Sequence, residues 1–329
     1  MKVENYKKPE VISYAHHAYP LGIIRCNESS EEWFYSNFIH IYYTEGINQF
    51  NFLVEYVNNP FIDMRHVYRE EFDWICNEIG LKKWICSEID RNNTFELMVD
   101  RFYLSTSEFY QKEHKMHEIL VTGYNERYCF YWDYVNGMYQ ENCGCWDEIV
   151  PHNSKLLYGE GIVAKITRTK NSSFKFDFRL IIEQLEDYYY SRELYSKLAL
   201  RGDHIRYKDC MFGIECIKKY INYLEENMYQ RIDYRYLNVF YEHKKCMLLR
   251  IKYISNLGMY LDVTCWEELE IEWKKILNLA LKYNIKLKSK NKDYGIYLDI
   301  IKRIEELYGI EKRELRGLIE NLRKVIDKE

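Results

Sequence analysis

Hydrophobic and polar positions follow two different patterns along the chain. Up to about residue 170, short apolar runs are broken by turn residues, as in strands mixed with short helices. From about residue 171 onwards, apolar residues recur every three or four positions, as in amphipathic helices. The sequence therefore predicts an α+β domain over residues 1–170, followed by an all-helical domain over residues 171–329.

Individual elements can be predicted within the first part. A helix is expected to start near Ser29, because the acids that follow would interact favourably with the positive N-terminal end of a helix. We expect this helix to continue to about Tyr43, and a second one over Tyr68–Ile79 to end at Gly80. Strands are expected at Phe50–Val57, Trp84–Ile89, Phe95–Leu104 and Gly161–Thr167.

The clearest strand pattern covers residues 117–140. Two apolar runs flank Asn125, and a third run follows the turn sequence Asn136-Gly137, so an antiparallel meander is expected. A turn centred on Asn125 would place His117 directly opposite Asp133. Directly opposed Cβ atoms lie about 4.5–5.5 Å apart, which permits an imidazole–carboxylate hydrogen bond. A shift of the register by one residue would separate the two side chains.

A paired histidine and aspartate suggest a catalytic base. The carboxylate orients the imidazole ring and leaves its other nitrogen free to accept a proton. Cys26 lies just before the helix expected at Ser29, where the positive end of the helix would lower the pKa of a thiol. Cys26, His117 and Asp133 are therefore the candidate catalytic residues. The alternatives are a packing role for Cys26 and an ordinary surface pair for His117 and Asp133.

This order of residues resembles the papain-like superfamily, in particular transglutaminase-like enzymes and the peptidases that cleave bacteriocin leaders. Over residues 95–190 the chain is similar to the family of the butirosin biosynthesis acyltransferase. The positions that carry the resemblance are Val99-Asp100, Tyr103, His117, Gly123-Tyr124 and Asp133.

The resemblance implies a papain-like fold with a Cys-His-Asp triad and a cysteine-dependent acyltransferase. Such an enzyme forms an amide bond by moving an acyl or peptidyl group from a carrier-protein thioester to an amine, such as a diamine, in nonribosomal peptide biosynthesis. The implied partners are an acyl or peptidyl carrier protein and a small amine. No cofactor is expected, since the substrate arrives on the phosphopantetheine arm of the carrier.

Four aromatic residues near these positions are candidates for lining an acyl-chain channel. Their alternative role is packing in the hydrophobic core. They are Trp33, Tyr103, Tyr131 and Trp132.

Composition narrows the class of protein further. Lys and Arg number 47 against 51 for Asp and Glu, so the net charge of −4 argues against a dedicated nucleic-acid binder. The sequence shows neither a run of 18 apolar residues nor a secretory signal. We therefore expect a cytoplasmic protein whose ten cysteines are reduced thiols. Glycine-rich phosphate loops are absent, so no nucleotide cofactor is expected, and the absence of GxSxG disfavours a serine hydrolase.

Several other functions remain open. A cysteine peptidase would use the same triad, and an inactive papain-like fold could serve as a binding scaffold. A zinc site would need His114, His117, Cys143, Cys145 and His152, whose spacing is poor for a zinc site. The lysines between residues 282 and 292 form a positive run that could steer an acidic carrier protein, or simply face solvent.

Overall fold

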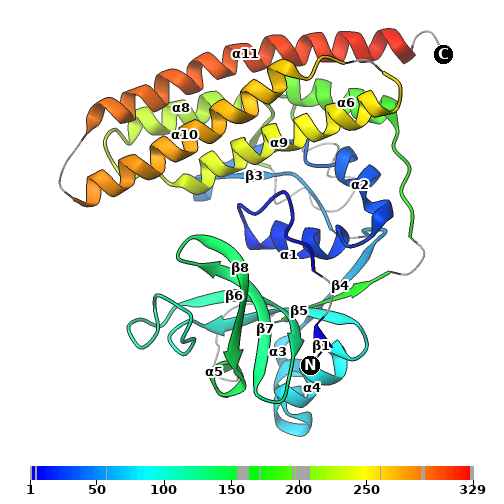
Figure 1. Ribbon diagram of the computed structural model, residues 1–329, viewed down its shortest axis with the longest axis vertical. Helices are drawn as coiled ribbons and strands as arrows, with labels where there is room; N and C mark the ends of the chain where they lie inside the picture. The colour runs from blue at the N-terminus through cyan, green and yellow to red at the C-terminus, as the bar shows by residue number, and fades with distance from the viewer. Residues whose placement is uncertain are drawn as a thin grey trace. The chain divides into compact units, whose positions relative to one another are not determined.

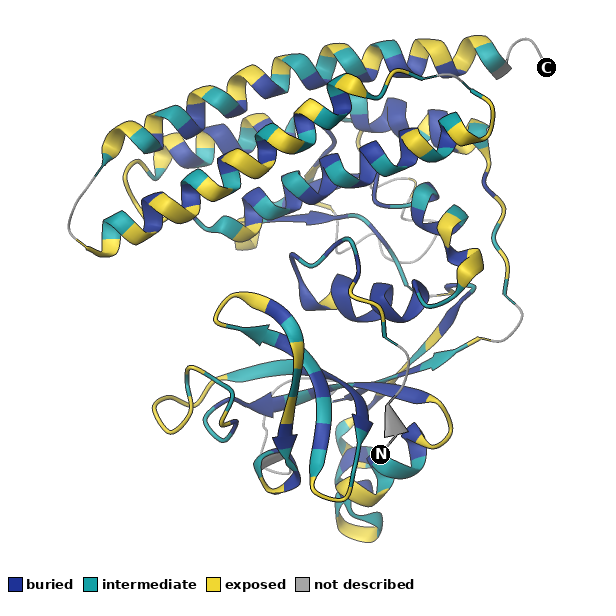
Figure 2. Ribbon diagram, viewed as in Figure 1, coloured by how far each residue is buried: buried dark blue, intermediate teal, exposed yellow. Residues whose placement is uncertain are grey.

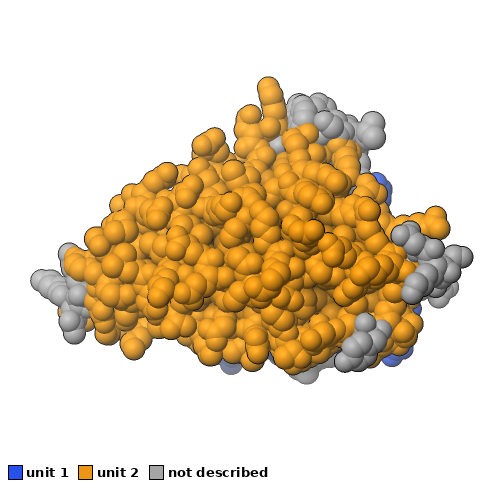
Figure 3. Space-filling model, turned by 90° about the horizontal axis from the view of Figure 1, so that it is seen from above, with its two compact units in different colours: residues 1–31, 55–174 blue, residues 32–54, 175–329 orange. Residues whose placement is uncertain are grey.

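The computed structural model describes residues 2–3, 6–56, 58–153, 163–169, 172–194, 197, 208–259, 261–289 and 293–326. This part of the chain is α+β, as predicted, and its strands pair antiparallel (Figure 1). The chain forms two compact units, which Figure 3 colours separately. The first unit contains residues 1–31 and 55–174, and the second contains residues 32–54 and 175–329.

A seven-stranded antiparallel sheet forms the frame of the first unit. Its strands are ordered β4-β9-β5-β6-β7-β8, and β1 pairs with β6 beside this path. The bounds are β1 Lys2–Val3, β4 Ile62–Val67, β5 Asn93–Asp100, β6 Met116–Tyr124, β7 Tyr128–Val135, β8 Met138–Cys145 and β9 Val163–Arg168. The meander predicted around residues 117–140 is thus confirmed as β6-β7-β8. Asn136 and Gly137 both have positive φ, 51° and 76°, as the tight turn between β7 and β8 requires.

Helices cover both faces of this sheet. Their bounds are α1 Ala15–Ile24, the 3-10 helix Glu28–Ser30, α3 Arg69–Trp74 with a π-helical continuation Ile75–Ile79, α4 Leu81–Ile89 and α5 Trp146–Asn153. One face packs against α3, α4 and α5 through a core that includes Leu97, Ile119 and Tyr131. Residues on the other face contact α1, which is buried on almost every side (Figure 2). A helix that is apolar all round is expected to be buried in this way.

The second unit combines long helices with a small sheet. The helices are α2 Glu31–Ser36, α6 Phe178–Tyr189, α8 Cys216–Glu226, α9 Tyr234–Asn256, α10 Thr264–Lys288 and α11 Tyr294–Ile326. The strands β2 Ile41–Thr44, β3 Gln49–Phe52 and β10 Cys210–Phe212 pair in the order β10-β2-β3. The helical periodicity predicted for the C-terminal part is confirmed, but the expectation of an all-helical domain is wrong, because β10 contributes a strand to this sheet.

Residues 32–54 join the second unit through specific contacts. The buried guanidinium of Arg250 on α9 donates hydrogen bonds to the carbonyl oxygens of Tyr35 and Asn37, just where α2 ends. Phe50 on β3 packs against the rings of Tyr220 and Phe240 at centroid distances of 5.4 and 5.5 Å. The compact units therefore differ from the division predicted at residue 170, since an early segment of the chain completes the later unit.

Two further predictions about local structure were wrong. The helix expected to reach Tyr43 ends at Ser36, because Phe38 has a left-handed φ of 55° and the aromatic run that follows forms β2. The segment Trp84–Ile89, predicted as a strand, belongs to α4, whose buried residues Leu81, Ile85 and Ile89 follow a helical spacing. The helix ending at Gly80 is confirmed, and the φ of 88° at Gly80 suits a residue without a side chain.

None of the helices within the described ranges is both long and apolar enough to cross a lipid bilayer.

Candidate active site

A β-bulge in the β6-β7 hairpin decides whether His117 and Asp133 can meet. Near the turn, Gly123 pairs with Phe130, and this register alone would leave the two side chains on opposite faces of the sheet. The bulge at Thr122 shifts the pairing by one residue, so that Leu120 pairs with Trp132. His117 and Asp133 consequently point to the same face. The direct pairing predicted for them is wrong, because they lie diagonally rather than opposite each other.

His117 and Asp133 are nevertheless in contact. The Nδ1 atom of His117 lies 3.3 Å from Oδ1 of Asp133 and 2.7 Å from the carbonyl oxygen of Glu118. Because a carbonyl oxygen only accepts hydrogen bonds, Nδ1 must carry the proton. The neutral ring then has its lone pair on Nε2, which accepts no hydrogen bond from any residue in the described ranges. The side chain is 26% exposed, so Nε2 is a base held in a fixed orientation within reach of solvent.

Arg101 holds Asp133 in place. One of its terminal nitrogens lies 2.6 Å from Oδ1 of Asp133 and also donates to the carbonyl oxygen of Tyr134. Both side chains of this ion pair are almost fully buried, at 8% and 3% exposure. The attraction between the two groups offsets part of the cost of burying them. The sequence analysis did not select Arg101. The adjacent charged residues Asp100 and Arg101, at the end of an apolar strand, could have indicated a functional position.

A second histidine–aspartate pair lies next to this one in the sequence. Nδ1 of His114 is 2.6 Å from Oδ2 of Asp100, and the imidazole stacks on the ring of Phe102. Burial would raise the pKa of Asp100, but hydrogen bonds from His114 and from the backbone N–H groups of Phe102 and Lys115 hold that pKa below its usual range. Asp100 and Arg101 are consecutive, so one short segment positions both histidines.

Cys26 lies at the C-terminal end of α1 rather than at the start of a helix. Its thiol donates to the carbonyl oxygen of Gly22 over 3.3 Å, and its backbone N–H donates to Ile23. The next helix is a single 3-10 turn whose N-cap is Asn27. The predicted lowering of the thiol pKa by a helix N-terminus is therefore wrong. Burial instead raises the pKa of Cys26, and the cations Arg168 and Lys7 offset this only in part.

The alternation of side chains shows which face of the sheet the histidine–aspartate pair occupies. His117 pairs with Val99 across β5 and β6, and Val99 belongs to the core beside α3, α4 and α5. Asp133 follows Tyr131, a member of the same core, by two residues on β7. Both catalytic candidates therefore point to the face that these three helices cover.

The chain around Cys26 belongs to the opposite face. Trp132, which alternates with Asp133, lies with its ring centroid 4.8 Å from that of Tyr6. The Tyr6 hydroxyl donates to the carbonyl oxygen of Ala18 in α1, the helix that Cys26 follows. No hydrogen bond joins Cys26 to His117, and both residues lie in described ranges. The structure thus brings two of the three predicted catalytic residues together, and it does not bring the third to them.

The four aromatic candidates for an acyl channel do not form one group. Trp33 belongs to the second unit and is buried against Phe38. Tyr131 is fully buried in the core of the first unit, where its hydroxyl meets Thr106, and Trp132 lies on the α1 face. Tyr103, half-buried in the loop after β5, has its ring centroid 5.9 Å from that of His114. Tyr103 thus lies beside His114, and Tyr131 is the neighbour of Asp133 on the same face of β7.

The structure also describes most of the residues proposed for a zinc site and for a positive surface. None of the ten cysteines, all of which lie in the described ranges, forms a disulfide bond. Among the residues that the structure describes, no group of three His, Cys, Asp or Glu side chains is arranged to hold a metal ion. The side chain of His152 and the lysines at positions 290 and 292 lie outside what is described. Within the same lysine run, Lys286 forms an ion pair with Asp293 at 2.6 Å.

No protein-family model matches the chain, and no curated protein matches it.

Proposed function

We propose that the chain transfers an acyl group from a thioester directly to an amine, with His117 as the general base and without an acyl-enzyme on Cys26. The observation that carries this proposal is the fixed orientation of the His117 ring. Its Nδ1–H is held by the Glu118 carbonyl oxygen and Asp133, which leaves Nε2 available to take a proton.

The reaction needs one base and no covalent intermediate. The amine nitrogen attacks the thioester carbonyl carbon, and Nε2 of His117 accepts the proton that the nitrogen loses. The C–S bond then breaks, and the leaving thiolate takes the proton back from the imidazolium. Asp133 stabilises the imidazolium between these steps, while Arg101 keeps Asp133 oriented.

The nature of the substrate rests on sequence resemblance. The proposal retains the papain-like fold, the acyl donor on a carrier-protein phosphopantetheine arm, the absence of a dedicated cofactor and a cytoplasmic location. A cysteine peptidase or a Cys26 acyl-enzyme would require the thiol beside His117. The position of Cys26 after α1 and the raised pKa of its thiol support the direct route instead.

An amide-forming assay tests the proposal. The full chain is incubated with a short acyl-pantetheine thioester and a primary diamine, and the amide is quantified by mass spectrometry. We expect His117→Ala to lower the rate about 10²–10⁴-fold, the usual contribution of a general base. His66→Ala is the matched control, because His66 is an exposed histidine on β4 of the same unit. Equal rates for the two variants would contradict the proposal.

A binding scaffold is the second candidate function. The separation of Cys26 from His117 favours it, since a papain-like fold that has lost its nucleophile can still bind. A scaffold would bind an acyl-loaded carrier protein but would not raise the rate of amide formation above the uncatalysed rate. The same assay, run on the unmodified chain, therefore separates the two functions.

A further inference from the structure

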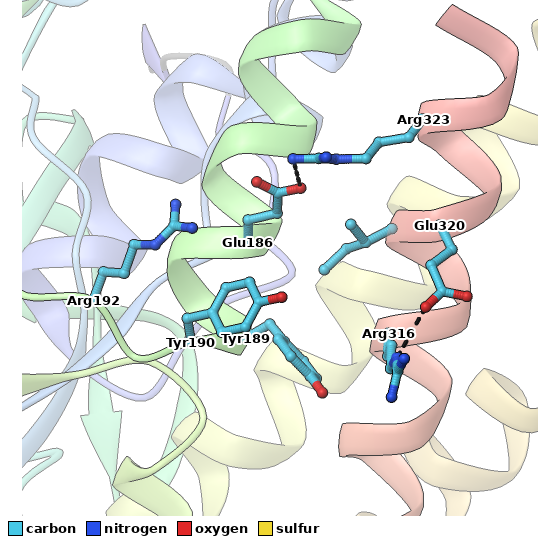
Figure 4. A pocket seen from close by; sticks show the side chains of 8 residues that line it. Glu186, Tyr189, Tyr190, Arg192, Arg316, Glu320 and Arg323 are labelled. Atoms are coloured by element: carbon cyan, nitrogen blue, oxygen red, sulfur yellow. Dashed lines mark hydrogen bonds and ion pairs between the residues drawn. The ribbon is translucent and has the colours of Figure 1, made fainter. Parts of the chain in front are cut away.

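A pocket of about 520 Å³ opens in the second unit, between the end of α6 and the C-terminal half of α11 (Figure 4). It is unrelated to the histidine–aspartate pairs, all of which belong to the first unit. Its size lies within the range of small-molecule sites in proteins. The lining residues are Glu186, Tyr189, Tyr190, Arg192, Arg316, Ile319, Glu320 and Arg323.

The charged groups around the pocket favour an anion. Three guanidinium groups and two carboxylates line it, which leaves one net positive charge. Among the residues that the structure describes, each guanidinium has one ion-pair partner, although it carries five N–H donors. The pairs are Arg323 with Glu186, Arg316 with Glu320 and Arg192 with Asp187.

These ion pairs leave the arginines accessible. The three arginine side chains are 48% to 70% exposed, so the N–H donors that their ion pairs leave unused are accessible. The carboxylates of Asp187 and Glu186 are only 4% and 10% exposed, so Arg192 and Arg323 keep these pairs, whereas the pair of Arg316 with Glu320 is exposed on both sides and weak. An incoming anion can therefore bind the unused donors and compete with Glu320 for Arg316. Figure 4 shows Arg323 on α11 reaching across to Glu186 on α6, and Arg316 beside Glu320 on α11.

The pocket also offers apolar surface. The rings of Tyr189 and Tyr190 lie almost perpendicular, with centroids 4.8 Å apart, and the buried Ile319 also lines the pocket. The guanidinium of Arg192 lies 5.1 Å from the ring centroid of Tyr190. An aromatic or apolar group of a ligand can pack on these rings while its charged end meets the arginines.

We propose that this pocket binds a small organic phosphate, a phosphate monoester that carries an aromatic or apolar group. A phosphate monoester is mostly a dianion at neutral pH and has three terminal oxygens, so it can accept hydrogen bonds from more than one guanidinium. A carboxylate carries one charge and would only replace what Glu186 and Glu320 already supply. The inference does not depend on the acyl-transfer proposal.

Isothermal titration calorimetry on the full chain tests the ligand class. Phenyl phosphate is the probe. Inorganic phosphate and phenol are the controls for its charged part and its aromatic part. We expect phenyl phosphate to bind about tenfold more tightly than inorganic phosphate, phenol to give no saturable heat, and added salt to weaken binding. The absence of saturable phenyl phosphate binding, or equal affinity for the two phosphates, would overturn the proposal.

Substitutions locate the site. We expect Arg316→Gln to weaken phenyl phosphate binding about tenfold, and Tyr189→Leu to weaken phenyl phosphate but not inorganic phosphate. Arg313→Gln is the matched control, since Arg313 is an equally exposed arginine on α11 that pairs with Glu314 and does not line the pocket. Arg316 is 70% exposed, so its substitution should not unfold the chain. Equal losses for Arg313→Gln and Arg316→Gln would show diffuse charge attraction and contradict a defined site.

Discussion

At the scale of single residues, burial decides the protonation of several groups. Desolvation disfavours the charged form of any buried ionisable side chain, so a buried thiol or histidine remains neutral unless a partner compensates. Cys26 and His40 show this effect in the two units, and each gives a measurable consequence.

The reactivity of Cys26 should be that of an ordinary, partly buried thiol. Burial raises its pKa, so little thiolate is present near neutral pH. We expect iodoacetamide to alkylate Cys26 more slowly than the exposed Cys143 at pH 8, and the rate at Cys26 to keep rising above pH 9. Peptide-resolved mass spectrometry measures both cysteines in one sample. Faster alkylation of Cys26 than of Cys143 below pH 8 would instead indicate an activated nucleophile.

His40 should make the second unit sensitive to acid. Burial lowers its pKa from 6.5 to about 4, so between these values the unfolded chain binds a proton that the folded chain does not. Stability should therefore fall as the pH drops through this window, by up to about 1.4 kcal/mol per pH unit for one such group.

The variant His40→Leu removes this titration. We expect its urea-unfolding free energy to fall less steeply between pH 6.5 and 4 than that of the unmodified chain. The slope should not vanish, because burial also lowers the pKa of His243. His66→Leu, at an exposed position, serves as the control and should leave the slope unchanged. Parallel curves for His40→Leu and the unmodified chain would refute the assignment.

At the scale of elements, the sequence pattern correctly predicted those helices, strands and turns that local interactions determine. The meander β6-β7-β8, the turn at Asn136-Gly137 and the helices of the C-terminal part follow from periodicity and turn residues. The bulge at Thr122, which sets the face on which His117 lies, was not predicted: Gly123 inside a strand is typical of a bulge, but periodicity does not say how the register shifts there. The position of Cys26 was also beyond local reasoning, since α1 is apolar on all sides and its end could not be read from periodicity.

A buried ion pair joins two of the long helices of the second unit. Lys244 on α9 and Glu311 on α11 form a salt bridge in which both side chains are fully buried. The hydroxyl of Tyr188 donates to the same carboxylate, and Nζ of Lys244 lies 2.9 Å from Nδ1 of His243. Removing one partner leaves an uncompensated charge in the core, whereas removing both does not.

A double-mutant cycle measures this pair. We expect Lys244→Met to destabilise the chain by about 3–5 kcal/mol, and the double variant with Glu311→Leu to be less destabilised than the sum of the single variants. Urea unfolding monitored by circular dichroism gives the free energies. Additive effects would contradict a coupled pair.

At the scale of the whole molecule, the chain order does not follow the compact units. Residues 32–54 lie early in the sequence but complete the second unit, through pairing of β2 with β10 and packing of Phe50 against α8 and α9. A domain division read from periodicity alone cannot detect such a segment, because the contacts that fix it are distant in sequence. The resemblance-based fold could not detect it either, since it covers only residues 95–190.

A fragment that ends at residue 170 should therefore not fold as an independent domain. It would keep residues 32–54 but lose their partners, exposing the edge of β2 and the apolar side chains of Phe50 and Phe52. We expect residues 1–170, expressed alone, to aggregate or to elute as a mixture in size-exclusion chromatography. A soluble monomer with a cooperative unfolding transition would contradict the observed division.

The account of function depends most on the claim that His117 acts without Cys26. The most direct measurement is the rate of amide formation by Cys26→Ala, with acyl-pantetheine and a diamine as substrates. Direct transfer predicts a rate within about threefold of the unmodified chain, because Cys26 lies apart from His117. A loss as large as that caused by His117→Ala, together with an acyl adduct on Cys26 in the unmodified chain, would contradict the account.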